Sequence, residues 1–113
     1  MKTKNENPFL VLEVGLEMLG AVAPLVRLLA RKAPDLARQV RRAAQSVPMN
    51  IAEGNSRVGR DRLHHFRVAS GSAREVIAGL RVALAFGDLE PREVAPAVEF
   101  ADRTVAMLYR LTN

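Results

Sequence analysis

Four long segments whose apolar residues recur every three or four positions constrain the fold of this chain most strongly. Pro34 separates the first segment from the second, Gly54 and Gly59 mark the turn before the third, and Gly87 ends the third. No segment alternates with the two-residue period of a strand, and no Asn-Gly hairpin turn is present. The pattern predicts helices over about residues 8–32, 35–57, 60–86 and 91–111. We therefore expect one domain, residues 1–113, with an all-α fold: an antiparallel, left-handed, up-down-up-down four-helix bundle.

Residues at the helix ends support these boundaries. Asn7 is suited to cap the first helix, and Pro8 follows it at the first helical position, where a missing N–H costs nothing. Prolines inside the segments predict irregularities: kinks at Pro24 and Pro48, and a fourth helix that begins late, bends or breaks at Pro96.

Periodicity also predicts which faces are buried. On the second helix the inward residues are Leu36, Val40, Ala43, Val47 and Ile51. On the third helix they are Leu63, Phe66, Ala73, Ile77, Leu80 and Leu84. Apolar residues on the first helix spread too far around it for one inward stripe, so we expect a neighbouring copy to cover some of them in a homo-oligomer.

Positive charge is concentrated in the middle of the chain. The formal net charge is +5, yet residues 27–74 contain eleven basic against three acidic residues. Fourteen of the seventeen basic residues are arginine, whose guanidinium grips phosphate or carboxylate in a two-pronged fashion. The candidate residues for nucleic-acid phosphates are Arg38, Arg41, Arg42, Arg57, Arg60, Arg67 and Arg74. The alternative is that these arginines form a solvated face or salt bridges between subunits.

The arginines follow the helical repeat. Arg38, Arg41 and Arg42 fall opposite the apolar side of the second helix. On the third helix, four arginines stand seven residues apart and form a nearly straight row, namely Arg60, Arg67, Arg74 and Arg81. Such a row suits a line of phosphates, or acidic residues on a neighbouring subunit, for which the outer helices offer Glu13, Glu17, Glu93, Glu99 and Asp102.

A run of small and polar residues links the second and third helices. Asn50 and Glu53 lie three apart on one helical face, and Glu53 can pair with Arg57 one turn later. The small residues at 69–73 would let the two backbones approach closely, with Ser70 or Ser72 as hydrogen-bond donors. We interpret Asn50, Glu53, Gly54, Gly71 and Ser72 as a structural motif, because no second carboxylate, histidine or cysteine is fixed beside it for acid–base chemistry.

Residues 46–54, Arg57 and residues 69–75 together resemble the signature of the 23S rRNA intervening-sequence proteins. The match extends back through residues 39–44 and forward to Leu80, Leu84 and residues 87–89. The resemblance implies a four-helix bundle that assembles into a pentamer and has no established catalytic activity or cofactor. The chain is also similar to the accessory variability determinant of retroelements. This second similarity implies a basic surface that engages nucleic acid and a reverse transcriptase. The chain departs from the pattern at Met49, where a small residue is usual, and in a first helix without an aromatic and acidic opening.

Other sites are not indicated. His64 and His65 are adjacent and lack the spacing that binds one metal, and no glycine loop has phosphate-binding spacing. Most of the few aromatic residues fall at core positions, so we expect no stacking platform and a largely electrostatic, salt-sensitive nucleic-acid contact.

The absence of cysteine and of a signal-like start in residues 1–7 favours the cytoplasm. The apolar segment 8–32 carries Glu13, Glu17 and Arg27, each of which costs ~2.5–3.5 kcal/mol at a bilayer centre, and this favours a bundle helix over a membrane span. The sequence thus predicts a non-enzymatic oligomer that binds or scaffolds RNA or DNA, with a reverse transcriptase or another nucleic-acid enzyme as a candidate partner. The alternative is a protein-interaction or structural oligomer.

Overall fold

The computed structural model describes residues 7–113, which form four α-helices and no strand. The helices are α1 (Pro8–Lys32), α2 (Pro34–Asn55), α3 (Gly59–Phe86) and α4 (Pro91–Thr112). The predicted boundaries are confirmed to within two residues. The largest difference is at the end of α2, which is Asn55 where the sequence predicted Arg57. The prediction that the chain has no secretory signal depended on its first residues, and residues 1–6 lie outside the described residues.

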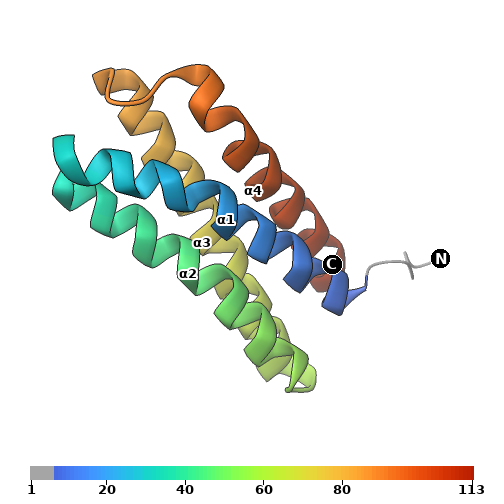
Figure 1. Cartoon of the computed structure of the whole chain (residues 1–113). Helices are drawn as coiled ribbons and strands as arrows, with labels where there is room; N and C mark the ends of the chain where they lie inside the picture. The colour runs from blue at the N-terminus through green and yellow to red at the C-terminus, as the bar shows by residue number, and fades with distance from the viewer. Residues whose placement is uncertain (1–6) are drawn as a thin grey trace.

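The helices form an antiparallel bundle in which each helix packs against two others (Figure 1). Helix α1 contacts α2 and α4, and α3 contacts the same two helices from the opposite side. The order around the bundle is therefore α1, α2, α3, α4, which places the α1/α2 seam opposite the α3/α4 seam. The predicted all-α four-helix bundle is confirmed, with extents of 45 × 22 × 18 Å.

Local chemistry explains where the helices begin and end. The Asn7 side chain accepts a hydrogen bond from the Phe9 N–H at 2.8 Å, as an N-cap does. Gly87 follows α3 with φ of 77°, a left-handed conformation that glycine adopts without strain. Gly59, the first residue of α3, also has a positive φ, of 63°.

The internal prolines do not interrupt the helices. Helices α1 and α2 continue through Pro24 and Pro48. Helix α4 begins at Pro91 and continues through Pro96, so the predicted late start or break at that residue does not occur. Pro96 lies in the second turn, where its missing N–H removes a single bond, to the Arg92 carbonyl.

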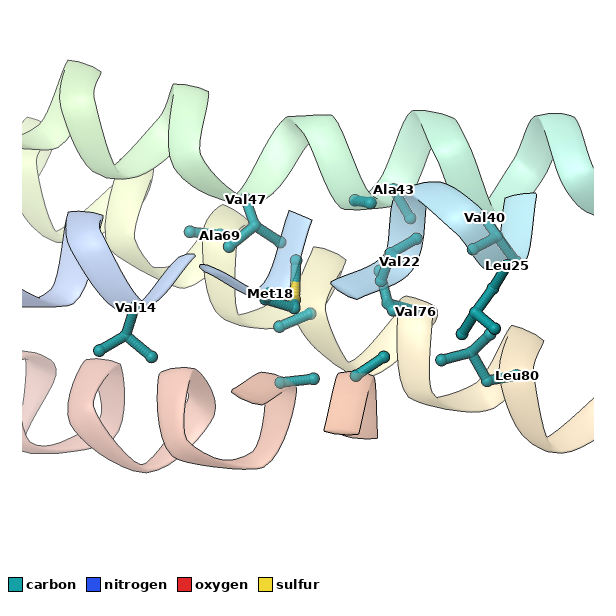
Figure 2. Close-up of a cluster of buried hydrophobic side chains, with 14 of the residues drawn as sticks. Val14, Met18, Val22, Leu25, Val40, Ala43, Val47, Ala69, Val76 and Leu80 are labelled. Atoms are coloured by element: carbon teal, nitrogen blue, oxygen red, sulfur yellow. The ribbon is translucent and has the colours of Figure 1, made fainter. Parts of the chain in front are cut away.

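The core consists of a heptad stripe from each helix, and Figure 2 shows side chains of α1, α2 and α3 meeting in the interior. On α2, four of the five predicted residues are buried, and Leu36 is half-buried. The stripe on α3 differs from the prediction: its buried residues are Phe66, Ala69, Ala73, Val76, Leu80 and Ala83. Three predicted members, Leu63, Ile77 and Leu84, are only half-buried. The other three predicted residues, Phe66, Ala73 and Leu80, are confirmed as buried. Alanines occupy the centre of the seam, which lets the helices pack closely and leaves the larger side chains at its flank.

Helix α1 is long and apolar enough to cross a membrane, and it is the one such helix in residues 7–113. Its inner face, including Val11, Met18 and Leu29, is fully buried in the core of the bundle. Other apolar residues of α1 remain exposed, as the breadth of its apolar surface predicted; these are Phe9, Leu10, Leu16 and Leu28.

Candidate functional site

A chain of hydrogen bonds joins α2 to α3 at the signature. Ser46 Oγ lies 2.8 Å from Ser72 Oγ across the seam. Asn50 Nδ2 donates to the Ser46 carbonyl at 2.9 Å and lies 3.0 Å from Ser46 Oγ. The amide oxygen of Asn50 then lies 3.1 Å from His65 Nδ1, so in this arrangement His65 Nδ1 carries the proton. Asn50 thus bonds to its own helix α2 through Nδ2 and to α3 through its amide oxygen.

A second group of contacts involves charged side chains near the turn between α2 and α3. His65 Nε2 lies 3.8 Å from Asp61 Oδ1, and the other oxygen of Asp61 accepts from Arg57 Nη1 at 2.7 Å. Arg57 also donates to Glu53 Oε2 from Nε at 3.0 Å and from Nη2 at 2.7 Å, which confirms the predicted pairing. These hydrogen bonds, first with Glu53 and then with Asp61, raise the pKa of Arg57.

Close approach of the two helices depends on glycines, but not on Gly71. A Cβ at Gly54 would lie 2.6 Å from the Phe66 ring, and one at Gly79 would lie 2.6 Å from Val40. A Cβ at Gly71 would meet nothing within 4 Å, because this residue lies on the exposed side of α3, away from α2. The prediction of a close contact at Gly71 is therefore wrong. The other residues of the motif lie on or beside the α2/α3 seam, namely Asn50, Glu53, Gly54 and Ser72.

All seven candidate arginines are exposed, but two already have carboxylate partners. Arg38 pairs with Asp35, and Arg57 holds Glu53 and Asp61. Within the described part of the chain, the other five make no ion pair within 4.0 Å, namely Arg41, Arg42, Arg60, Arg67 and Arg74. Pairing of these arginines with acidic residues of a neighbouring subunit stays a prediction.

The structure divides these arginines between two sides of the bundle. Arg41 lines a cavity of about 200 Å³ between α1 and α2, together with Arg27 and apolar side chains. Arg67 and Arg74 line a groove of about 310 Å³ between α3 and α4. Because the two seams lie on opposite sides of the bundle, Arg41 does not share a surface with Arg67 and Arg74.

The sequence matches the model of one protein family. The family model of the 23S rRNA-intervening sequence proteins matches residues 16–110, nearly the whole chain. The chain belongs to this family. The predicted resemblance is thereby confirmed, and the matched range includes the whole α2/α3 hydrogen-bond chain.

A solved structure has the same fold as this 23S rRNA-intervening sequence protein. It is the crystal structure of a protein of unknown function from the S23 ribosomal protein family of Bacteroides thetaiotaomicron, with a TM-score of 0.84 and 17% sequence identity. The similarity covers 91% of this chain and 98% of the other. No curated protein matches the chain significantly.

Neither the family nor the structural neighbour has an enzymatic description, and the geometry of this family member agrees with a structural role for the signature. His65 bonds to an amide, where a serine nucleophile would be expected in a hydrolase, and the nearby carboxylates are held by Arg57. Among residues 7–113, no group of three or more acidic, histidine or cysteine side chains is placed to hold a metal ion. His64 is exposed, and His65 is half-buried at its contact with Asn50.

Sequence reasoning missed one residue of this 23S rRNA-intervening sequence protein, Tyr109. The prediction that most aromatic residues lie in the core is wrong: of the five, only Phe66 is buried, and Phe9, Phe86 and Tyr109 are exposed. Tyr109 lines the α3/α4 groove beside Arg67 and Arg74. Its neighbours Met107 and Leu108 are buried, and an apolar pattern alone does not show which of several adjacent large side chains faces the core.

Proposed function

We propose that this 23S rRNA-intervening sequence protein is a non-enzymatic, oligomeric, cytoplasmic protein that binds the phosphates of RNA or DNA through exposed arginines of the α2–α3 hairpin. The hairpin, residues 34–86, carries nine arginines against four acidic residues, whereas α1 and α4 carry six basic against five acidic residues. The positive charge is therefore concentrated on one half of the bundle, where it would attract a polyanion.

The observation that carries this proposal is the arginine row on α3. Arg60, Arg67, Arg74 and Arg81 are all exposed, and none makes an ion pair with another described residue. Seven residues of helix rise by about 10 Å, so the row presents one guanidinium every two turns along one side of α3. A guanidinium without a carboxylate partner is available for a phosphate oxygen.

RNA is the better first probe. The description of the family refers to 23S rRNA, and that of the structural neighbour refers to a ribosomal protein family. Both descriptions support a ribosomal RNA context for the proposed partner, with a polymerase or another nucleic-acid enzyme as a further candidate partner.

The test is a salt series with two variants that separate the arginine surfaces. One variant combines Arg67→Gln with Arg74→Gln, and the other combines Arg38→Gln, Arg41→Gln and Arg42→Gln. Each phosphate contact contributes about −0.7 to the slope of log K against log salt for single strands, and about −0.9 for duplex DNA. We expect the double variant to lower the steepness by about 1.4–1.8, and Arg92→Gln on α4 to change it little. Binding that is absent at low salt, or a slope that neither variant alters, would contradict the proposal.

A protein-interaction role is the second candidate, favoured by the exposed apolar side chains of α1. Phe9 is 68% exposed and Leu10 50%, and Leu16 and Leu28 are also exposed. Such side chains favour burial against another protein surface, including a second copy of the chain. Light scattering in the buffers of the salt series measures the mass; a pentamer that binds no nucleic acid would support this second role.

A further inference from the structure

We infer that the groove between α3 and α4 is a subsite for an unpaired nucleotide, with the base stacked on Tyr109 and the phosphate held by Arg67 and Arg74. This inference rests on the proposed function and specifies its ligand as single-stranded nucleic acid or an unpaired loop. The groove has a volume of about 310 Å³ and is formed by side chains from both helices.

Tyr109 provides the stacking surface. Its side chain is 61% exposed, and no ring or cation–π contact involves it within the described residues. An exposed aromatic ring beside unpaired arginines is the combination that single-strand-binding proteins use, since every base has a flat face that can stack. The side chain is thus available at the position where a base would lie.

The α3 side of the groove provides the phosphate contacts. Arg67 and Arg74 are exposed, lie two helical turns apart and have no acidic partner among the described residues. Ser70 lies between them on the same side and adds a hydroxyl donor. These three side chains suit the oxygens of one or two successive phosphates.

The α4 side of the groove orients the nucleotide. Helix α4 ends here, and its last carbonyls carry the negative pole of the helix dipole, which disfavours an anion. Thr112 Oγ1 donates to the Leu108 carbonyl at 2.9 Å, and Asn113 Nδ2 donates to the Tyr109 carbonyl at 3.1 Å, so both donors are occupied. The phosphate is therefore directed to the arginines of α3 and the neutral base to Tyr109.

Gly71 leaves space for the ligand. It lines the groove between Arg67 and Arg74, and a Cβ there would meet no atom within 4 Å. The absence of a side chain at this residue does not serve contact with α2, but it leaves the groove open. A large side chain at residue 71 would fill it.

The geometry distinguishes single strands from duplexes. In a duplex, each base is covered on both faces by its neighbours, so its flat face cannot reach Tyr109 unless the base leaves the stack. The arginines alone would bind either form through its phosphates.

Tyrosine fluorescence provides a direct test, because Tyr109 is the single tyrosine and the chain has no tryptophan. Titration with an unlabelled single-stranded RNA should quench this fluorescence, and the same RNA annealed to its complement should not. Tyr109→Leu should weaken binding to the single strand by about 5- to 150-fold, the effect of losing one base–aromatic stack, and should leave the salt slope unchanged. Tyr109→Phe should keep the affinity, because it keeps the ring.

A matched pair of glycine variants controls for general effects. Gly71→Leu should weaken binding to the single strand, whereas Gly20→Leu, at an exposed glycine of α1 that also has no atom within 4 Å of a Cβ, should not. Circular dichroism of all variants verifies that the helices are intact.

The outcomes separate this inference from the proposed function. If Arg67→Gln with Arg74→Gln weakens binding but Tyr109→Leu does not, and fluorescence is unchanged by the single strand, the nucleotide subsite is wrong and phosphate binding stands. Equal affinity for single strand and duplex would also overturn the subsite. No binding of either RNA at low salt would overturn the proposed function and the subsite with it.

Discussion

Gly54 of α2 lies directly against the ring of Phe66 of α3. A Cβ at residue 54 would be 2.6 Å from Cε1 and 2.8 Å from Cδ1 of that ring. Phe66 is 1% exposed and belongs to the buried stripe of α3, so its ring cannot move aside without disturbing the core. The distance between the two helices at this end of the hairpin therefore depends on glycine at residue 54.

Replacement of Gly54 by alanine should destabilise the protein. The added methyl group overpacks a filled site, and we expect the free energy of unfolding to fall by about 1–3 kcal/mol. Urea denaturation followed by circular dichroism measures this change.

Gly71→Ala is the matched control, because its Cβ would meet no atom within 4 Å and the residue lies inside a helix. Alanine there should raise the free energy of unfolding by about 0.5–1 kcal/mol, since glycine loses more backbone entropy on folding. Equal stability of Gly54→Ala and the original protein would show that Phe66 can repack.

Asn50 and His65 should be energetically coupled. The hydrogen bond between them, at 3.1 Å, joins α2 to α3 in a part-buried position. A double-mutant cycle with Asn50→Ala and His65→Ala should give a coupling energy of about 0.5–1.5 kcal/mol in urea denaturation. The same cycle with His64→Ala should give a value near zero, since His64 is exposed and makes no hydrogen bond to Asn50 within the described chain. Similar couplings for both histidines would contradict the network.

Arg57 should contribute less to nucleic-acid binding than Arg67. Its guanidinium already donates to Glu53 and Asp61, and these carboxylates would have to release it to a phosphate. We expect Arg67→Gln to reduce the steepness of the salt dependence by about 0.7–0.9, and Arg57→Gln to reduce it clearly less. Fluorescence anisotropy with a labelled RNA across the salt series makes the comparison; a larger effect at Arg57 would show that its carboxylate partners are displaced.

The stabilising effect of Arg57 should not change with pH across the neutral and mildly basic range. The hydrogen bonds with Glu53 and Asp61 raise the pKa of Arg57 in the folded protein. For a base with a raised pKa, the stabilisation is present below the unfolded-state pKa and is lost only as pH rises through the folded-state value. Arginine remains protonated below about pH 12, so the difference in urea midpoint between Arg57→Gln and the original protein should be constant from about pH 7 to pH 10. If this difference in urea midpoint declined between about pH 7 and pH 10, the stabilisation would depend on a titratable group other than the Arg57 guanidinium.

Much of the fold follows from local sequence. Asn7 before Pro8, and Gly87 after an apolar stripe, mark helix ends through the backbone conformations that these residues favour. The pairing of Glu53 with Arg57 also follows from sequence, because residues four apart on a helix are always neighbours. Such features depend on the geometry of a single helix.

The sequence predicted three of the six buried residues of α3, namely Phe66, Ala73 and Leu80, but not which of two adjacent apolar residues faces the core. Val76 and Ile77 are adjacent and both apolar, and each fits a helical stripe, yet Val76 is fully buried and Ile77 half-buried. Which of the two faces the core depends on the positions of α2 and α4 around α3, and these positions result from packing between segments distant in sequence.

The arrangement of the candidate site was likewise decided by tertiary structure. The sequence determined that Arg41, Arg67 and Arg74 lie away from the apolar side of their own helices, and the structure confirms that each is exposed. Only the order of the helices around the bundle places Arg41 at the α1/α2 seam and brings Tyr109 of α4 beside Arg67 and Arg74 of α3. The periodicity of a helix specifies which side of it is polar, but the direction in which that side points is set by packing against the other three helices.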